Sequence, residues 1–364
     1  MSARICLPGI APCGTLPTFL PPLHTIICIV VFLVLSPFSS QALGQTSKEN
    51  AQMIDSLKEL PVGLGILPLP DSPPDNLQTR RKINLGRRLF FDRVLSSDRS
   101  MSCGTCHDPA KGFSDGRRRA IGFHGHALPR HTPSIWNAAY NSSQFWDGRA
   151  ASLEEQASGP MMSATEMNAP KEPELTERLE ADARYRRDFE AVFGERPTIK
   201  NLAKAIAAFE RTVVTSGSRF DHYARGQKNA LGLQEKNGLV LFIGKARCAR
   251  CHNGPNFTDN KFQNIGTGSE EDPGRYSITH LEQDRGAFKT PSLRNAALHA
   301  PYMHDGSAAT LDAVIDYYDR GGNEKQGKSP FMMKIGLTPQ EKHDLIAFLK
   351  TLTDTSAIVA KPSK

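Results

Sequence analysis

The chain has 364 residues, of which 39% are hydrophobic and 23% are charged, and this is the composition of a soluble globular protein. Its length exceeds what one ordinary core holds and predicts two domains once a leader is removed. The formal net charge is +7, but no basic block is long enough for a nucleic-acid-binding tract. We therefore expect no nucleic acid among the partners.

Residues 1–42 have the features of a secretory signal peptide. Arg4 supplies positive charge, and residues 26–35 form an unbroken apolar run that is short for a bilayer span. Residues 40–42 (Ser-Gln-Ala) provide a small-x-small cleavage site. These features predict export of the protein, and an uncleaved membrane anchor is the alternative.

The chain after the leader alternates between loops and helical patterns. A polar, Pro-rich arm at 43–78 is expected to be poorly ordered. An amphipathic helix is predicted at about 78–91. Ser152, with Glu155 three residues later, forms a capping box that opens another helix, and residues 201–212 have helical spacing.

The second half begins near the polar stretch at 216–228, which is the predicted domain boundary. A helix at about 231–243 follows it. Thr310 is predicted to cap a helix that runs to Arg320 and stops at two glycines. Thr338 is followed by Pro and, three residues later, by Glu, which predicts the start of the last helix. No stretch alternates at period two, so the fold is predicted to be mainly α.

Two identical cysteine patterns carry the strongest chemical signal. Residues 103–107 read Cys-Gly-Thr-Cys-His, and residues 248–252 read Cys-Ala-Arg-Cys-His. Two thiols at this spacing reach the two vinyl groups of one porphyrin, and the adjacent His then ligates the iron. A zinc site would need four ligands close together, and a redox pair would need a βαβ context. We therefore predict two covalently bound haem c groups, with thioether bonds at Cys103, Cys106, Cys248 and Cys251 and iron ligands at His107 and His252.

Further motifs resemble those of the bacterial di-haem cytochrome c peroxidases and their relative MauG. The resemblance covers about residues 80–355 and implies two cytochrome-c-like domains: a peroxidatic domain at 79–222 and an electron-transfer domain at 223–355, followed by a tail at 356–364. The matching motifs lie at 85–92, 102–107, 145–149, 159–160, 166–167, 289–295 and 301–306.

The resemblance implies that the two haems have different roles. The haem on His107 corresponds to the high-spin haem that reacts with hydrogen peroxide. The haem on His252 corresponds to the low-spin haem that relays electrons. Trp146 matches the tryptophan that stands between the two haems in this family, whereas Trp136 has no match and is interpreted as a core residue.

The family's peroxide pocket contains a Gln, a Pro and a Glu, which are matched by Gln156, Pro160 and Glu166. A carboxylate near the iron can move a proton between the two peroxide oxygens and so help to break the O–O bond. Taken alone, Glu166 would be interpreted as a surface acid, but its spacing from Trp146 within the matched block favours the pocket.

The sixth ligand of the second haem distinguishes the subfamilies. Peroxidases of this family place a Met at a set distance after the His of a Tyr-x-His-x-Gly motif, and the same distance from His304 reaches Tyr318, as in MauG. Tyr318 is predicted to share a helix face with Leu311, Val314 and Ile315. The alternatives are that Tyr318 is an ordinary core residue or that Tyr317 is the ligand.

The resemblance leaves two other ligand sites open. The family's distal His on the first haem aligns with Phe123, which favours an open site, but a shift of one residue would restore His124; His126 and His131 are also nearby. The family also holds calcium between its domains, with backbone carbonyls at His299 and Pro301 and an Asn side chain where this chain has His131. Imidazole is a poor calcium ligand, so calcium is disfavoured.

The sequence thus predicts a periplasmic di-haem oxidoreductase that reduces hydrogen peroxide. Its electron donor would be a small redox protein, such as a c-type cytochrome or a cupredoxin, or a side chain of a protein substrate, as for MauG. A homodimer is compatible with the resemblance. The alternative from another class is a non-enzymatic di-haem electron carrier, and a haem-based sensor would need an output domain that the sequence lacks.

Overall fold

The structure is a computed structural model that describes residues 40–354 and residue 356. The predicted signal peptide, except for its last residues, and most of the predicted tail lie outside this range. Within the described range, no helix is long and apolar enough to cross a bilayer. Helices dominate, which confirms the mainly α prediction.

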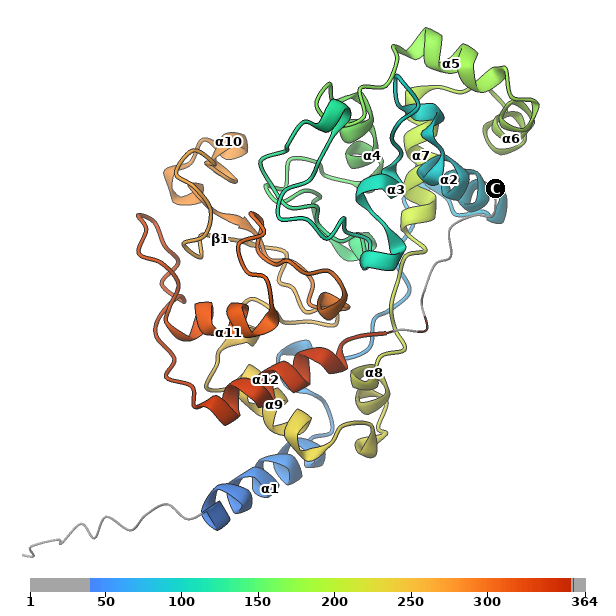
Figure 1. Ribbon diagram of the computed structural model, residues 1–364. Helices are drawn as coiled ribbons and strands as arrows, with labels where there is room; N and C mark the ends of the chain where they lie inside the picture. Colours follow the sequence, from blue (N-terminus) through green and yellow to red (C-terminus); the bar gives the residue numbers. More distant parts are fainter. Residues whose placement is uncertain (1–39, 355, 357–364) are drawn as a thin grey trace, which may run out of the picture. The chain divides into compact units, whose positions relative to one another are not determined.

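The helices follow one another along the chain with long loops between them (Figure 1). The two strands are only two residues long, and they pair antiparallel with Phe262 opposite Lys289. The elements are α1 Ser40–Ser56, α2 Arg80–Phe91, α3 Cys103–Cys106, α4 Leu153–Met162, α5 Glu172–Glu180, α6 Ala183–Phe193, α7 Ile199–Glu210, α8 Arg219–Ala224, α9 Leu233–Ile243, β1 Phe262–Gln263, α10 Tyr276–Thr279, β2 Phe288–Lys289, α11 Leu311–Asp319 and α12 Pro339–Thr351.

Side-chain caps set the start of the helices that position the site. Ser152, Thr310 and Thr338 each accept a hydrogen bond from the backbone N–H three residues later, at 3.1, 3.1 and 3.2 Å. These caps are the ones that the sequence predicts, and each satisfies an N–H group that would otherwise lack a partner. α4, α11 and α12 therefore begin where they were expected.

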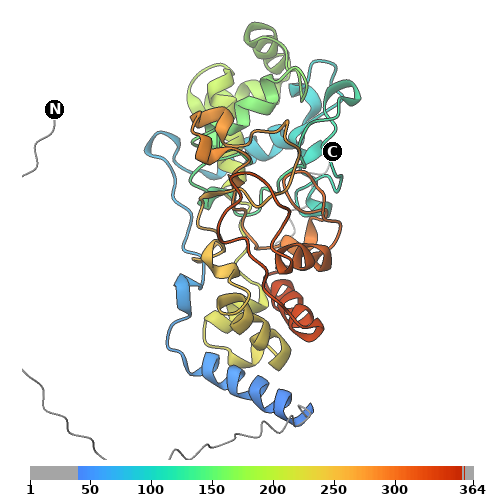
Figure 2. The same cartoon turned by 90° about the vertical axis from the view of Figure 1, so that its left-hand side faces the viewer.

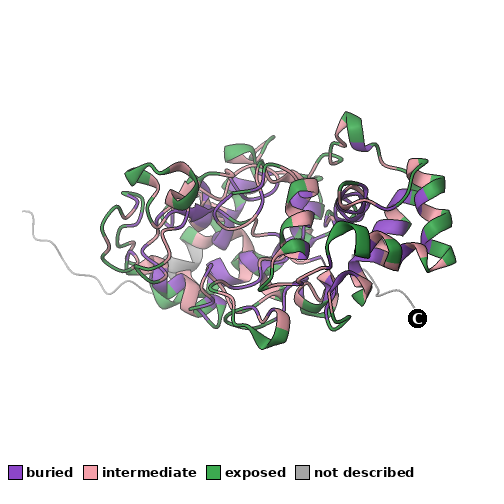
Figure 3. Ribbon diagram, turned by 90° about the horizontal axis from the view of Figure 1, so that it is seen from above, coloured by how far each residue is buried: buried purple, intermediate pink, exposed green. Residues whose placement is uncertain are grey.

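The first hydrophobic core forms where α2 crosses α7. Gly86 lies at the crossing, and a Cβ atom there would come within 1.7 Å of the Ala205 carbonyl oxygen, so only glycine permits this approach. The rings of Phe90 in α2 and Phe209 in α7 pack edge to face beside it, with their centroids 5.1 Å apart. Figure 3 looks nearly along α7, whose residues are coloured as buried on almost every side.

The second hydrophobic core has the same kind of close helix crossing at a glycine, where α9 crosses α12. A Cβ atom on Gly238 would come within 2.0 Å of the Asp344 carbonyl oxygen. Phe348 of α12 takes the place that Phe209 has in the first core. Buried residues change from the first cluster to the second between Val213 and Phe220, so α8 packs with the second half.

The Pro-rich arm contradicts the prediction of poor order over its described part. The carboxylate of Asp55 in α1 accepts hydrogen bonds from Tyr223 at 2.9 Å and from Lys236 at 2.6 Å, so α1 runs beside α8 and α9 (Figure 2). The Val62 carbonyl accepts a hydrogen bond from the Gly254 amide at 3.0 Å. Farther along, Asn76 donates to the Glu154 carboxylate at 2.6 Å. The arm is therefore bound to both halves by side-chain and backbone hydrogen bonds.

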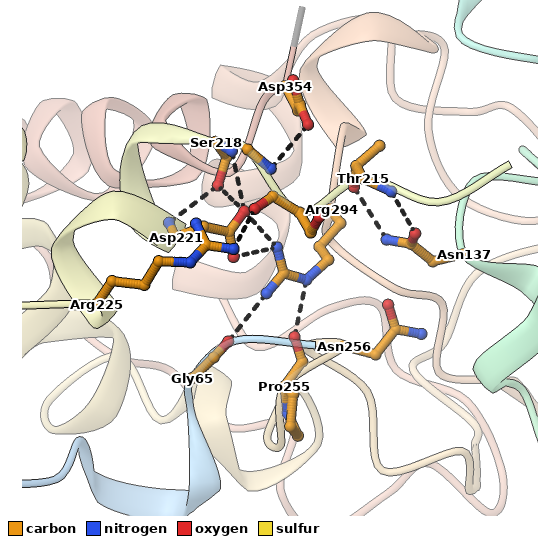
Figure 4. A network of polar contacts seen from close by, with 12 residues as sticks. Gly65, Asn137, Thr215, Ser218, Asp221, Arg225, Pro255, Asn256, Arg294 and Asp354 are labelled. Carbon is orange, nitrogen blue, oxygen red and sulfur yellow. Dashed lines mark hydrogen bonds and ion pairs between the residues drawn. The ribbon is translucent and has the colours of Figure 1, made fainter. Parts of the chain in front are cut away.

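A buried ion pair between Arg294 and Asp221 of α8 lies next to the arm (Figure 4). Arg294 and Asp221 are both fully buried, and their side chains meet at 2.8 Å. Arg294 also donates to the Gly65 carbonyl at 3.0 Å and to the Pro255 carbonyl at 2.8 Å. Removing one partner of such a pair costs roughly 3–5 kcal/mol, because the other charge is left buried alone.

Candidate haem sites and active site

One cavity of about 790 Å³ contains both Cys-x-x-Cys-His motifs. Its walls are mostly apolar side chains, with a few polar groups among them. The structure brings every residue to which the sequence analysis assigned a role to this cavity: Cys103, Cys106, His107, Trp146, Gln156, Pro160, Glu166, Cys248, Cys251, His252 and Tyr318.

The first motif forms the short helix α3. Ser102 and Thr105 make a reciprocal capping box at its start, in which the Ser102 amide donates to the Thr105 hydroxyl at 2.9 Å. The Nδ1 atom of His107 lies 3.1 Å from the Phe113 carbonyl oxygen. A histidine that ligates a metal usually donates its other ring N–H to such a carbonyl, which directs Nε2 to the metal.

The second motif repeats this arrangement in a 3₁₀ turn, Cys248–Arg250. The Nδ1 atom of His252 lies 3.1 Å from the Phe257 carbonyl oxygen. Phe113 and Phe257 both have a positive φ, of 58° and 53°, which turns each carbonyl toward its histidine. Burial lowers the pKa of His107 and His252, so both rings are neutral and able to donate a lone pair to iron.

The four cysteines of the motifs are free thiols. Burial raises the pKa of Cys106 and Cys251 to about 11 and that of Cys248 to about 12, and it raises the pKa of Cys103 as well. A catalytic redox pair needs a thiol with a lowered pKa. The shifts therefore disfavour the redox-pair alternative.

The pocket residues of the first site come from α4 and the turn after it. Gln156 and Pro160 lie on α4, and Glu166 follows it. Burial raises the pKa of Glu166, and the nearby Arg149 opposes this shift only in part. The loop at Gly122 packs tightly here, since a Cβ atom on that residue would lie 2.0 Å from the Thr165 carbonyl oxygen.

None of the three histidines considered for the first site, His124, His126 and His131, has a free nitrogen directed at it. The side chain of His124 is 75% exposed and lies 3.7 Å from Asp98, outside the walls of the cavity. His126 is exposed as well. The ring of His131 borders the cavity, but Nδ1 lies 2.7 Å from the Arg117 carbonyl oxygen and Nε2 lies 3.3 Å from the Ser114 hydroxyl. These positions favour the open first site over a distal His124.

Trp146 connects the two halves. Its indole N–H donates to the His131 carbonyl at 2.9 Å, and its own carbonyl accepts from the Lys289 amide at 2.8 Å. Its ring lies 6.4 Å from the ring of His304, at an angle of 67°. Trp136, in contrast, is buried in the first core against Phe113, which agrees with its interpretation as a core residue.

The two adjacent tyrosines of α11 differ in their surroundings. Tyr318 borders the cavity, and its hydroxyl group makes no hydrogen bond to any residue of the described range. Burial raises its pKa, and the thiols of the second motif add to this shift. The hydroxyl of Tyr317 donates to the Ile265 carbonyl at 2.8 Å and accepts from the Asn323 amide at 3.2 Å. The cavity face of α11 also includes Leu311, Val314 and Ile315.

The structure reveals an internal repeat that extends far beyond the cysteine motifs. Asn137 and Asn295 have φ values of 59° and 58°, and each opens a single 3₁₀ turn. The halves also exchange hydrogen bonds reciprocally, because the His131 amide donates to the His304 carbonyl at 2.7 Å while the Lys289 amide donates to the Trp146 carbonyl at 2.8 Å. Residues separated by the same distance in sequence as Asn137 and Asn295 are equivalent in the two halves. These pairs are His131 and Lys289, Pro133 and Pro291, Trp146 and His304, Gly148 and Gly306, Ser152 and Thr310, and Pro160 and Tyr318.

Glu210 and Lys289 are two of the charged residues in the walls of the cavity to which the sequence analysis gave no role. Glu210 ends α7 with one carboxylate oxygen buried and without a hydrogen-bond partner. Lys289 is nearly as deeply buried. A charged residue next to an apolar helical run, as in Ala-Ala-Phe-Glu, is the signal that could have identified Glu210.

The residues present fit two covalently bound haems. Each motif offers two free thiols and a neutral imidazole, and the Tyr318 hydroxyl is available as an iron ligand on the side of the second motif. The fit to calcium is poorer, since both ring nitrogens of His131 have protein partners and nitrogen is not the donor that calcium prefers. Calcium therefore remains a prediction that this residue disfavours.

Comparisons with known proteins show the family of the chain. The di-haem cytochrome c peroxidase family matches residues 80–229, and the cytochrome c family matches residues 236–353. MauG of Methylorubrum extorquens is 42% identical over 294 residues, which cover 80% of this chain and 83% of that protein. Cytochrome c551 peroxidase of Nitrosomonas europaea is 38% identical over 295 residues, which cover 79% of this chain and 84% of that protein.

A solved structure is also similar over most of the chain. It is the crystal structure of a MauG-like protein associated with microbial copper homeostasis, with a TM-score of 0.76 and 38% identity. The match covers 81% of this chain and 95% of that one. The chain therefore belongs to the di-haem cytochrome c peroxidase and MauG family, whose members are oxidoreductases with two haems c.

Proposed function

We propose that this protein is a periplasmic enzyme that reduces hydrogen peroxide at the site of His107 and receives electrons through the site of His252. One observation carries the proposal: the two ends of the cavity are unequal. Near the first motif, His124 and His126 are exposed and His131 is bonded within the protein, whereas Tyr318 lies on the side of the second motif with no hydrogen-bond partner among the described residues.

The chain's own residues account for the proton transfer at the first site. Burial raises the pKa of Glu166, so this carboxyl group keeps its proton to a higher pH than a surface glutamate does. From this position, Glu166 can take a proton from one peroxide oxygen and deliver it to the other. The amide of Gln156 can donate and accept hydrogen bonds and so orient the peroxide. A bound haem supplies the iron that exchanges electrons with peroxide.

The second site is suited to a different task. An oxygen ligand from Tyr318 would stabilise oxidised iron better than a thioether does, because an anionic donor favours the more positive metal. Trp146 lies between the halves, hydrogen-bonded to both, and is our candidate for the group that couples the two sites. The Tyr ligand favours a MauG-like enzyme that stores oxidising equivalents.

The electron donor is proposed from the relatives. Cytochrome c peroxidases in this family indicate a small c-type cytochrome or a cupredoxin, and MauG indicates oxidation of a protein substrate. The predicted signal peptide and the covalent haems support a periplasmic location. A di-haem electron carrier without enzymatic activity is the weaker alternative, since the first site would then need a sixth ligand, and His124, His126 and His131 are not placed to supply it.

The proposal is tested by adding hydrogen peroxide to the ferric holoprotein and following its absorption and electron paramagnetic resonance spectra. We expect one high-spin and one low-spin haem before the addition, and reaction of the ferric protein without prior reduction. A requirement for half-reduction before turnover would favour an ordinary peroxidase over a MauG-like enzyme. Two low-spin haems that do not respond to peroxide in either redox state would contradict the enzyme.

A further inference from the structure

Lysine and arginine side chains are buried at four positions among the described residues. Three of the four are held by oxygen atoms of the protein, and the fourth, Lys289, makes neither an ion pair nor a side-chain hydrogen bond with any residue in that range. The three held side chains are Lys82, which donates to Asn76 at 2.9 Å, Arg211, which pairs with Glu154 at 2.6 Å, and Arg294, which pairs with Asp221 at 2.8 Å.

An unpaired ammonium group is costly inside a protein. Burial without a compensating charge disfavours the ionised form, and burial is the one cause that lowers the pKa of Lys289 to about 8. With that pKa, the side chain still carries its proton at pH 7. The described part of the fold therefore holds a cation in the cavity and pairs it with none of its own carboxylates.

In the internal repeat, the position of Lys289 is occupied by a different residue in the first half. His131 is the equivalent residue in the first half, and both of its ring nitrogens have protein partners. Lys289 occupies the same place in the second half, one residue before a Thr-Pro-Ser sequence that both halves share. The amide of Lys289 donates to the Trp146 carbonyl, while its side chain has no partner among residues 40–354.

Arg130 and Arg149, the other cations at this part of the cavity, already pair with carboxylates of the protein. Arg130 pairs with Asp147 at 2.7 Å and with Asp272 at 2.8 Å. Arg149 pairs with Asp147 at 2.9 Å. Lys289 is thus the cation beside Trp146 that has no carboxylate partner in the described range, and haem brings carboxylates of its own, because each porphyrin carries two propionates.

We propose that Lys289 binds a haem propionate beside Trp146 and thereby raises the reduction potential of that haem. The proposal rests on the proposed function, because it requires the two haems. A fixed cation near the iron stabilises the reduced, less positive state, and in a buried site this effect is weakly screened. Lys289 is a positioning residue here and touches no peroxide.

The test compares the full-length di-haem holoprotein with its Lys289→Met and Lys289→Arg variants. Haem content is measured first, and the midpoint potential of each haem is then measured by spectroelectrochemistry. We expect two haems in every variant, a lower potential for one haem in Lys289→Met, and a potential close to that of the wild type in Lys289→Arg. Resonance Raman bands from propionate bending should shift in Lys289→Met.

Lys82→Met is the matched control, because Lys82 is equally buried but bonded to protein oxygens. This variant should lose stability and keep both potentials. The proposal would be overturned if Lys289→Met held two haems with unchanged potentials, or if Lys82→Met shifted them as much. Should Lys289→Met fail to acquire its haems, Lys289→Gln takes its place under the same criteria. Peroxide turnover of the wild type is scored separately, so failure of the enzyme proposal is distinct from failure of this one.

Discussion

Tyr317 and Tyr318 are neighbours in α11, yet only Tyr318 offers its hydroxyl group to the cavity. We predict that Tyr318→Phe removes or alters the low-spin haem signal, because the ligand oxygen is lost, and leaves the high-spin signal unchanged. Electron paramagnetic resonance of the ferric protein measures both signals.

Tyr317→Phe serves as the control for this prediction. It should keep both signals and lose about 1 kcal/mol of stability, since the Tyr317 hydroxyl bonds to the backbone at Ile265 and Asn323. An unchanged low-spin signal in Tyr318→Phe would mean that Tyr318 is an ordinary core residue and not an iron ligand.

Glu210 makes stability depend on pH. Burial raises its pKa to about 8, with Arg211 opposing the shift, so between the ordinary value of 4.5 and about 8 the folded protein holds a proton that the unfolded chain has released. The free energy of unfolding should therefore fall as pH rises through this window, by about 1.4 kcal/mol per pH unit from this group.

Glu210→Gln removes this contribution while it keeps the shape of the side chain. Denaturant unfolding of the wild type and the variant at pH 5 and pH 7.5 gives the comparison. The variant should gain stability relative to the wild type at the higher pH. Parallel pH profiles would show that Glu210 is ionised in the folded protein. Leu349 follows Phe348 in the second half as Glu210 follows Phe209 in the first, so the second half has an apolar side chain where the first has Glu210.

At the scale of elements, the crossings of α2 with α7 and of α9 with α12 depend on single glycines. We predict that Gly86→Ala destabilises the protein by about 3 kcal/mol, because the new Cβ atom would overlap the Ala205 carbonyl oxygen and the helices must separate. Urea unfolding followed by far-ultraviolet circular dichroism measures the loss.

Gly65→Ala is the control for the crossing, since no atom lies within 4 Å of a Cβ at that position. It should change the free energy of unfolding by less than about 0.5 kcal/mol. Equal stability of Gly86→Ala and the wild type would mean that the two helices can move apart without cost.

Helix starts were predictable from the sequence for a local reason. Ser152, Thr310 and Thr338 satisfy backbone N–H groups three residues away, so the signal and the structure lie within one turn. The order of the Pro-rich arm was not predictable in the same way. Its partners, such as Gly254 and Tyr223, lie far along the sequence, and composition alone describes a free linker.

At the scale of the whole molecule, the cysteine motifs alone predicted two haems. The roles of the other motifs could be predicted only from the resemblance to a family. The wider repeat could be read from the sequence, because the Thr-Pro-Ser of 132–134 recurs at 290–292 and the Asp-Gly of 147–148 recurs at 305–306.

The functional positions of the repeat differ between the halves. Trp146 and His304 are equivalent, as are Pro160 and Tyr318, yet a tryptophan and a histidine share no chemistry that a sequence pattern would detect. Lys289 could not be identified from the sequence, since only burial distinguishes it from a surface lysine.

The anchoring of the arm has a consequence for the order of folding. Ile54 and Leu64 belong to the second hydrophobic core, whose other members begin at Phe220. As the chain emerges on the far side of the membrane in the proposed export, these early residues therefore stay exposed until the residues of the second core have followed. Contacts so distant in sequence form late, and chaperones have time to bind the waiting segment. The arm is therefore synthesised first and packs against the rest of the protein last, once both halves are present.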